Sequence, residues 1–413
     1  MMTTRTYRAS AFLRAAGRLR VPVVVGSEKP QSLAAAVPAA HLTLPFARPA
    51  EAVRRIREFA GKHPVAAVLA ADDEGAVLAA RAAQALGLRH AAVEAVRAAR
   101  DKHRMREVLA RAGLRSPRYH RIGLDEDPRE AGSRVGYPLV VKPLSLAASR
   151  GVIRADDPGQ LVAACRRAAA IVRTADGALA GEEGGRWLLL EGYIPGEEIA
   201  LEGVLARGRL QVLALFDKRD PLNGSFFEES IYVTPSCQPA EVREQVVGVT
   251  ASALHVLGLK EGAVHAELRI NEEGPWILEI APRSIGGLCS RTLRFEGGAT
   301  LEEILIRHAL GLPVASHELY GGASGVMMIP VPYAGVLRGV SGRAAAREVA
   351  GIEDLLITAV VGGRLVPLPE GSRYLGFIFA RAERPDEVEA ALREAHRRLV
   401  FDIDPMDSSR PAG

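Results

Sequence analysis

Two glutamates, Glu267 and Glu279, occupy corresponding places in two short runs of alternating apolar and polar residues. The runs, 264–270 and 275–280, flank a polar, glycine-bearing turn, which is the pattern of an antiparallel hairpin. A three-residue loop at 272–274 would place the two glutamates directly opposite each other. Facing carboxylates destabilise a strand pair unless a cation lies between them, and Mg²⁺ binds through one or two carboxylates plus substrate phosphates. The hairpin therefore predicts a magnesium site, with a solvated polar face as the alternative.

The same hairpin predicts one polar and one apolar face. His265 and Arg269 share the face of the two glutamates, together with Ile277. Trp276 and Leu278 are expected on the opposite, core side. The polar face is therefore the one that we expect to bind a ligand.

Arg283 follows Glu279 by four residues and precedes the pair Gly286-Gly287. A guanidinium in this place can reach anionic oxygens that the metal ion also binds. This arginine favours a site that binds phosphate or carboxylate groups over a solvated polar face.

Lysine is rare in this chain, which places it only at positions 29, 62, 102, 142, 218 and 260 among 53 basic residues. Some of these positions are expected to need a compact ammonium group that the planar guanidinium of arginine cannot replace, although chance is the alternative for any single lysine. Lys102 follows Asp101, a predicted N-cap, and a cation is unfavourable in the first turn of a helix. It is therefore either a ligand-binding group or a simple solvent-exposed lysine.

Lys142 ends a short apolar run, 138–142, and the small-residue segment 144–151 follows it. A lysine on a strand before such a loop lets backbone N–H groups close over phosphates while the ammonium group binds them. This pattern predicts a phosphate-binding loop.

A second hairpin pairs 198–206 with 210–218 across a three-residue loop, 207–209, and places Glu198 opposite Lys218. The pair belongs either to a binding site or to a plain cross-strand ion pair. The turn-rich segment 220–236 that follows is suited to covering a site.

Length and composition exclude several classes of protein. The chain has 413 residues, which predicts two to three domains, and its 48% hydrophobic and 25% charged residues are typical of a globular protein. A net charge of +4 without a basic stripe argues against nucleic-acid binding. The chain has no apolar run that could span a membrane and no signal-peptide layout, so we expect a cytoplasmic protein. Cys165, Cys237 and Cys289 are scattered, so each is expected to be a buried thiol.

The order of the expected elements gives the fold class. Helix and strand patterns alternate over residues 1–100, which predicts a Rossmann-like parallel α/β domain whose usual opening strand is missing or very short. No dinucleotide or P-loop signature occurs, and the acidic run 72–74 is expected to cap a helix. Short strands and a terminal helix after residue 310 predict an α+β unit. The class is therefore α/β, with a central unit of mixed α+β character.

Five segments, taken in order, resemble one family, the ATP-grasp ligases, and in particular the L-amino acid ligases and related carboxylate–amine ligases. The segments are DKHRM at 101–105, GYPLVVKP with SRGV at 136–152, LEGYIPGEE at 190–198, DKRDPLNGSFFEESIYVTPS at 217–236, and HAELRINEEGPWILEIAPRSIGGL at 265–288. The resemblance implies an N-terminal domain at 1–100, an ATP-grasp domain of two α+β lobes at 101–310 with a lid lobe at about 117–190, and a C-terminal α+β domain at 311–413.

The resemblance also implies a role for each matching residue. The groups that would bind ATP are Lys102, Lys142, the loop Ser149, Arg150 and Gly151, the adenine hinge Glu191, Gly192, Tyr193 and Ile194, and the ribose-binding Glu198. The metal ligands would be Glu267 and Glu279, for Mg²⁺ or alternatively Mn²⁺. Arg283 and Lys218 would act at the reacting groups, and Glu229 or His265 would accept the amine proton. The amino-acid pockets would be lined by Tyr232, Ser284, Gly286 and Gly287.

By this resemblance the chain would join a carboxylate and an amine, expected to be amino acids, through an acyl phosphate, acting as a monomer or a homodimer. Two alternatives stay open: a biotin-carboxylase-like enzyme that phosphorylates bicarbonate, and a nucleotide-binding regulator without turnover. Two departures bear on them. Ala281 replaces an asparagine that serves many relatives as a third metal ligand, and the loop LSLAASRG at 144–151 is poor in glycine.

Overall fold

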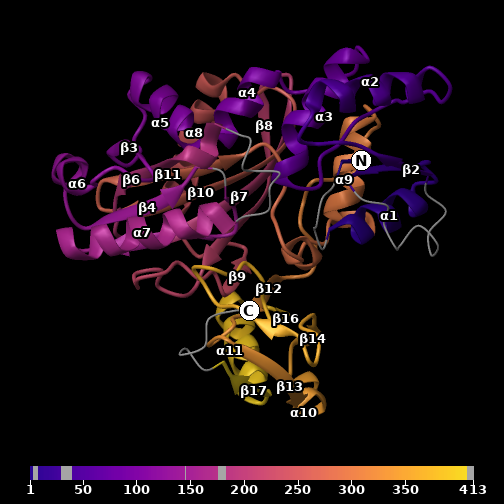
Figure 1. The fold of residues 1–413 in the computed structure, drawn as a ribbon. Helices are drawn as coiled ribbons and strands as arrows, with labels where there is room; N and C mark the ends of the chain where they lie inside the picture. Colours follow the sequence, from indigo (N-terminus) through magenta and orange to yellow (C-terminus); the bar gives the residue numbers. More distant parts are fainter. Residues whose placement is uncertain (3–7, 29–39, 145, 175–182, 407–413) are drawn as a thin grey trace.

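The structure is a computed structural model that describes residues 1–2, 8–28, 40–144, 146–174 and 183–406. An N-terminal unit and a lid lobe lie on either side of a large sheet, and the C-terminal unit extends from one end of that sheet (Figure 1). Within the described residues, no helix combines the length and the apolar character needed to cross a bilayer.

The N-terminal unit is built on short parallel pairings. β1 and β2 pair in parallel, and Met2 forms parallel bridges to both Gly26 and Ala70. The expected opening strand is thus reduced to Met2, and the strand expected at 65–70 is reduced to the bridge at Ala70. The elements are α1 (Ala9–Arg18), β1 (Val24–Ser27), β2 (Ala40–Thr43), α2 (Pro49–Ala60), α3 (Asp73–Ala85) and α4 (Val93–Arg100). As expected from the acidic run, Asp72 caps α3, since its side chain accepts the Gly75 N–H.

The lid lobe is a four-stranded sheet, in the order β3-β6-β4-β5, covered by α6 and α7. Helix α5 leads into it, and its N-cap is Asp101, whose side chain accepts two backbone N–H groups as predicted. The elements are α5 (Lys102–Arg111), β3 (Tyr119–Gly123), α6 (Arg129–Val135), β4 (Leu139–Pro143), β5 (Ile153–Ala155), α7 (Pro158–Thr174), the short 3-10 helix η2 (Glu183–Arg186) and β6 (Trp187–Gly192).

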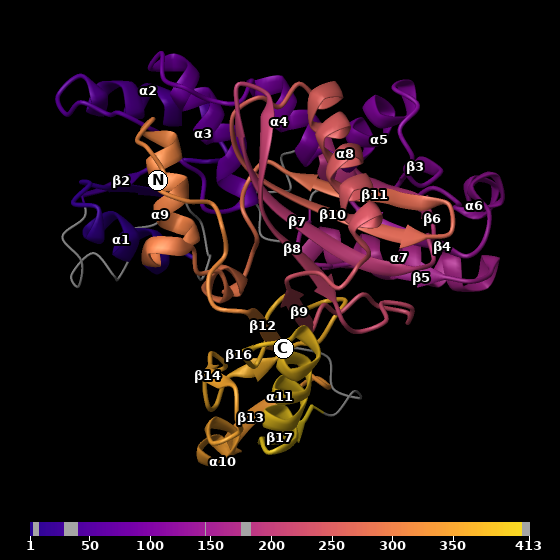
Figure 2. The same ribbon diagram turned by 180° about the vertical axis from the view of Figure 1, so that it is seen from behind.

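The large sheet has eight strands in the order β11-β10-β7-β8-β9-β12-β16-β14, and it continues without a break into the C-terminal unit. Helix α8 covers its first strands, with Leu254 and Leu257 packed against Leu268 and Ile277 in one apolar core. Helix α9 begins with a capping box at Thr300 and packs beside α1 (Figure 2). The elements are β7 (Glu197–Ala206), β8 (Arg209–Lys218), β9 (Ile231–Thr234), α8 (Ala240–Leu257), β10 (Gly262–Asn271), β11 (Gly274–Ala281), η3 (Cys289–Thr292), η4 (Glu296–Gly298) and α9 (Leu301–Ala309).

The C-terminal unit adds three strands to the large sheet's far end and a separate three-stranded sheet, β15-β13-β17. Its helix α11 packs on β12 and β16 around a core that includes Val388 and Leu392. The elements are β12 (Ala323–Ile329), β13 (Gly335–Ser341), α10 (Arg343–Arg347), β14 (Ile352–Ile357), β15 (Arg364–Leu365), β16 (Gly376–Ala382), α11 (Pro385–Arg397) and β17 (Val400–Pro405).

Of the three cysteines, Cys165 and Cys289 are buried, and burial raises the pKa of each thiol to about 12. Cys237 is exposed, so the expectation that it is buried was wrong. It lies just after β9, where the chain leaves the sheet, and Arg219 donates a hydrogen bond to its sulfur.

Candidate active site

A cleft lies between the lid sheet and the hairpins of the large sheet, and the space within it, including open solvent at its mouth, is about 730 Å³. Residues from both sheets and from the loop after β4 line it. The predicted site residues among them are Lys102, Lys142, Ser149, Glu191, Gly192, Tyr193, Ile194, Glu198, Glu229, Glu267 and Glu279. Sequence segments almost 180 residues apart thus meet in one cavity.

Glu267 on β10 and Glu279 on β11 are partners in the strand register, as the sequence predicts. The predicted three-residue loop was wrong, however. Asn271 pairs with Gly274, so the turn has two residues, and Leu278 is an extra residue that forms a bulge. The bulge, rather than a longer loop, restores the facing of the two glutamates.

The bulge also reverses the expected faces between itself and the turn. Ile277 is fully buried in the apolar core instead of sharing the polar face, and Leu278 lines the cleft instead of the core. Trp276, predicted as core, is only half-buried and packs under the guanidinium of Arg115.

The second hairpin has the same feature. Glu198 lies opposite Lys218 as predicted, but the turn is two residues long and Leu213 forms the bulge. Arg207 and Gly208 both have positive φ, which suits a two-residue hairpin turn.

The environment of the facing glutamates fits a divalent cation. Glu279 is half-buried at the cleft, and among the described residues no hydrogen bond or ion pair engages its carboxylate. Glu267 contacts His265 and Lys218 at 3.3 Å each, both longer than a strong charge-assisted hydrogen bond. Burial acts to raise the pKa of Glu267, but Lys218, His265 and Arg283 outweigh it and hold that pKa well below its usual range. Two facing carboxylates, one of them without a protein partner in the described part of the chain, match what Mg²⁺ binds in proteins.

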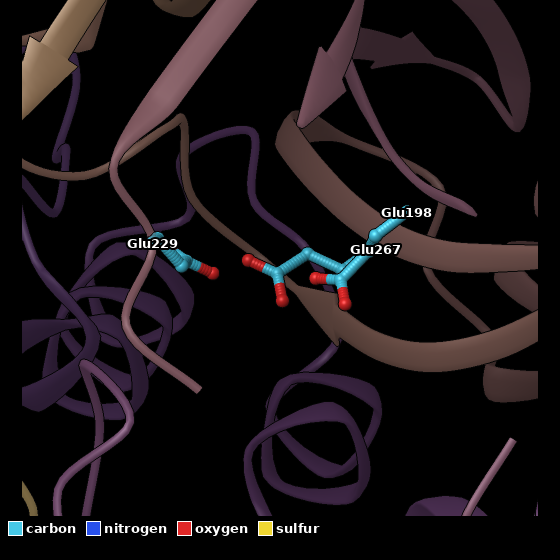
Figure 3. Close-up of side chains that lie close together, drawn as sticks. All are labelled: Glu198, Glu229 and Glu267. Atoms are coloured by element: carbon cyan, nitrogen blue, oxygen red, sulfur yellow. The ribbon is translucent and has the colours of Figure 1, made fainter. Parts of the chain in front are cut away.

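Three carboxylates surround the buried ammonium group of Lys218. Glu198 and Glu229 each lie 2.5 Å from Nζ, and Glu267 lies 3.3 Å from it. Figure 3 shows these three carboxylates converging on one small space from separate strands and a loop. Burial acts to lower the pKa of Lys218, but the surrounding carboxylates raise it well above its usual value. Lys218 therefore serves as the fixed cation of this cluster, and it does not line the cleft surface.

Lys142 reaches the cleft from β4 and forms an ion pair of 2.7 Å with Glu191 on β6. Arg106, which the sequence analysis did not single out, contacts the other oxygen of Glu191 at 2.7 Å and donates a hydrogen bond to Leu278 O. Burial acts to raise the pKa of Glu191, but Arg106 and Lys142 together lower it to about 2. This buried triad fixes the ammonium group of Lys142 at the cleft and ties α5 to the hairpin bulge.

The Glu191→Gln variant is expected to show a weaker dependence of unfolding free energy on acidity. The pKa of Glu191 is lowered on folding, so its ionised carboxylate stabilises the folded state. This stabilisation is fully present above about pH 5 and is lost as the pH falls toward 2. The gap in stability between the wild type and the variant should narrow by roughly 2–3 kcal/mol between pH 6 and pH 3. Urea unfolding at both pH values measures it, with the exposed Glu130→Gln as control. A gap that stays constant would contradict the assignment.

Arg269 holds the hinge that follows β6. Its guanidinium contacts Glu198 at 3.1 Å and donates hydrogen bonds to the carbonyls of Ile194 and Leu222. Tyr193 packs against it, with the guanidinium 5.0 Å from the ring centroid. The position of Arg269 on the polar face of the hairpin was predicted, but its role in holding the hinge was not.

The predicted phosphate loop lies over Lys102, whose ammonium group donates a hydrogen bond to Leu146 O at 3.0 Å. Ala148 and Ser149 both have left-handed backbone angles, φ +56° and +54°. Such angles are unfavourable for residues other than glycine, so these two residues place backbone strain in this loop. Ser149 lines the cleft, whereas Arg150 and Gly151 do not.

The C-terminal unit contacts this loop directly. Gly151 N–H donates to Pro369 O, and Arg150 Nε donates to Glu370 O. Arg167 of α7 binds the Glu370 carboxylate through two hydrogen bonds of 2.6 and 2.9 Å. The segment 369–370 therefore holds the lid lobe against the rest of the molecule.

By the resemblance to ATP-grasp ligases, the Arg167→Ala variant is expected to raise the KM for ATP two- to fivefold with little change in kcat. An exposed ion pair contributes at most about 1 kcal/mol, and its loss releases only one contact between the lid lobe and the C-terminal unit. Arg173→Ala is the matched control, because Arg173 lies on the same helix and pairs with Asp125 inside the lid lobe. Steady-state kinetics of both variants measure the effect. Equal KM values for Arg167→Ala and the wild type would show that this contact does not restrain the lid.

Arg283 is half-buried beside the glutamate pair and is held by Asp73 at the start of α3, with Nε and Nη2 each 2.8 Å from one oxygen. Burial acts to lower the pKa of Arg283, but Asp73, Glu279 and Glu267 raise it. Asp73 was expected only to cap a helix, yet Asp72 alone performs that task. A run of three acids where one suffices was the signal for a second role.

The turn after Arg283 is also fixed from the N-terminal unit. Arg8 donates hydrogen bonds to the carbonyl and the hydroxyl of Ser284 and pairs with Glu302. Gly287 has a φ of +58°, and an added Cβ would lie 3.5 Å from Phe377 and 3.7 Å from Cys289, whereas Gly286 faces open space. Gly286 and Gly287 therefore leave room beside an apolar wall that the C-terminal unit provides.

Glu229 connects this side of the site to the cleft. Tyr232 donates a hydrogen bond of 2.8 Å to it, and burial raises the pKa of both groups. His265 bridges two carboxylates, with Nδ1 3.3 Å from Glu202 and Nε2 3.3 Å from Glu267. Both ring nitrogens are thus engaged by protein groups, whereas Glu229 faces the cleft.

Comparisons with known proteins agree with this geometry. The model of the ATP-grasp N-terminal domain matches residues 13–90, that of the ATP-grasp domain matches 135–292, and that of L-amino acid ligase C-terminal domain 2 matches 327–404. Fold and matched segments are those of the ATP-grasp class, a family that implies binding of ATP and Mg²⁺.

Residues 135–292 therefore form an ATP-grasp domain, and residues 327–404 match C-terminal domain 2 of the L-amino acid ligases. It is 31% identical over 243 residues to alanine–anticapsin ligase of Bacillus subtilis (strain 168), covering 55% of this chain and 50% of that protein. The chain spans about half the length of these curated relatives.

Two solved structures share the fold. The L-amino acid ligase from Bacillus licheniformis superimposes with a TM-score of 0.80 at 24% identity, over 98% of each chain. The biotin carboxylase domain of the 2-oxoglutarate carboxylase from Hydrogenobacter thermophilus, solved with MgADP and bicarbonate, gives 0.67 at 19% identity, over 98% of this chain and 90% of that chain.

Proposed function

We propose that this protein is an ATP-dependent, ADP-forming ligase that joins a carboxylate to an amine as an amide, and that both substrates are amino acids. The observation that carries the proposal is the facing pair Glu267 and Glu279 at the cleft, with Arg283 beside them. The match of residues 327–404 to an L-amino acid ligase domain supports the choice of substrate class.

In the first step, the γ-phosphoryl group of ATP passes to a carboxylate oxygen and gives an acyl phosphate and ADP. Lys142, Lys102 and the loop 146–149 bind the phosphates, and the hinge 191–194 with Glu198 binds the nucleoside. Arg283 binds the carboxylate and balances the negative charge that develops during transfer. Mg²⁺ held by Glu267 and Glu279 would supply further charge neutralisation at the phosphates.

In the second step, the amine nitrogen forms a bond to the acyl carbon, the bond from that carbon to the phosphate oxygen breaks, and the amine releases a proton. Glu229 is the favoured proton acceptor, because burial raises its pKa and its carboxylate lines the cleft. His265 is less suited, because it does not line the cleft. Protein groups contact both candidates: two carboxylates contact His265, and Lys218 and Tyr232 contact Glu229. The lid excludes water, which would otherwise hydrolyse the acyl phosphate.

The domain boundaries 1–100, 101–310 and 311–413, with a lid lobe at about 117–190, are part of this proposal. So are Tyr232, Ser284, Gly286 and Gly287 as residues that line the amino-acid pockets. Three further points remain predictions: activity with Mn²⁺ in place of Mg²⁺, a homodimeric assembly and a cytoplasmic location.

Phosphate release measured across a matrix of amino-acid pairs, with mass spectrometry of the products, tests this proposal. ADP formation that needs two amino acids and yields a dipeptide is the expected result. Release that depends on bicarbonate would favour the biotin-carboxylase-like alternative, and nucleotide binding without any release would favour a regulator.

A further inference from the structure

Glu202 on β7 is a fully buried carboxylate that the proposed reaction does not use. Its Oε2 lies 3.3 Å from His265 Nδ1 and accepts the Ile285 N–H at 2.8 Å. Its Oε1 has no hydrogen-bond partner within the described part of the chain. Leaving a carboxylate oxygen unpaired in a dry interior is unfavourable, so this position calls for a functional explanation.

The strand register places Glu202 directly across from His265, in the pairing of β7 with β10. His265 then extends to Glu267, with Nε2 3.3 Å from Oε1. The three groups form a continuous chain from the interior of the sheet to the cleft. The Ile285 N–H, from the turn after Arg283, fixes Glu202 itself.

The arrangement has the form that orients metal ligands in proteins, where a buried carboxylate fixes a neighbouring polar group and that group fixes the ligand. We propose that Glu202 is a positioning residue that, through His265, sets the direction of the Glu267 carboxylate for a divalent cation bound with the nucleotide. This inference rests on the proposed function only in taking Glu267 as a metal ligand.

Binding of Mn²⁺ in the presence of ADP, followed by electron paramagnetic resonance, tests the inference without turnover. The Glu202→Gln variant keeps the volume of the side chain but replaces the acceptor that faces His265 with an amide. It is expected to bind Mn²⁺ about 10–100-fold more weakly than the wild type. His265→Gln should show the same loss, and the double variant should lose no more than His265→Gln alone.

Glu303→Gln is the matched control, since Glu303 is a buried glutamate of α9 that pairs with Arg18 away from the cleft. It should lower the melting temperature and leave Mn²⁺ binding unchanged. If Glu202→Gln does not fold, the His265→Gln result alone decides.

Mn²⁺ binding at wild-type strength in Glu202→Gln or His265→Gln, or additive losses in the double variant, would overturn the inference. Failure of the wild type itself to bind Mn²⁺ with ADP would instead contradict the proposed function, so the two failures are distinguishable.

Discussion

The Glu279→Gln variant is expected to lose at least about 10²–10³-fold in turnover while it folds as the wild type does. Glu279 has no protein partner among the described residues and faces a second carboxylate across the strand pair. Removing its charge relieves a like-charge pair, so the melting temperature should stay unchanged or rise slightly. Loss of activity without loss of stability is the signature of a ligand-binding carboxylate.

Release of ADP at saturating substrates, together with thermal unfolding, measures both effects. Glu273→Gln, in the exposed turn of the same hairpin, is the control and should be fully active. Turnover of Glu279→Gln within about twofold of the wild type would show that the facing pair is only a polar surface.

The Arg283→Lys variant is expected to lower kcat/KM for the carboxylate substrate by about 10²–10³-fold. Lysine keeps the charge but loses the planar fork, and Arg283 already uses two of its donors on Asp73. A single ammonium group cannot satisfy Asp73 and a substrate carboxylate in the same geometry. The prediction therefore distinguishes a bidentate group from a simple positive charge.

Initial rates of ADP formation with varied carboxylate concentration measure this effect. Arg294→Lys, which changes an exposed ion pair with Glu353, is the matched control and should leave the rates unchanged. Equal kcat/KM values for Arg283→Lys and the wild type would remove Arg283 from the carboxylate site.

The two hairpins show how far strand pairing can be predicted from the sequence. The facing of Glu267 with Glu279 and of Glu198 with Lys218 was confirmed, because alternation of apolar residues fixes which side chains share a face near the cleft. The loop lengths were wrong in both hairpins, since a bulge changes the register as one extra loop residue does. Only the packing of Ile277 and Leu278 reveals the bulge, and that packing depends on elements distant in sequence.

The sequence did not reveal which residues hold the predicted site residues in place. Glu191 is held by Arg106, Arg283 by Asp73, and His265 by Glu202. In each pair the two residues are more than 60 positions apart in the sequence. No local periodicity encodes such contacts. The first depends on how α5 meets the lid sheet, the second on how the N-terminal unit meets the large sheet, and the third on the pairing of β7 with β10. The prediction of a strand at 65–70 was wrong for a related reason. The parallel partner of this segment is reduced to Met2, and a single bridge does not make a strand.

Direct phosphoryl transfer to a carboxylate can be followed with a substrate whose carboxylate carries ¹⁸O. Inorganic phosphate released during amide formation is then analysed by mass spectrometry. One ¹⁸O atom is expected in each phosphate, because the acyl carbon leaves one of its oxygens on phosphorus. Formation of ADP and amide with unlabelled phosphate, or release of AMP and pyrophosphate in place of ADP, would contradict direct transfer.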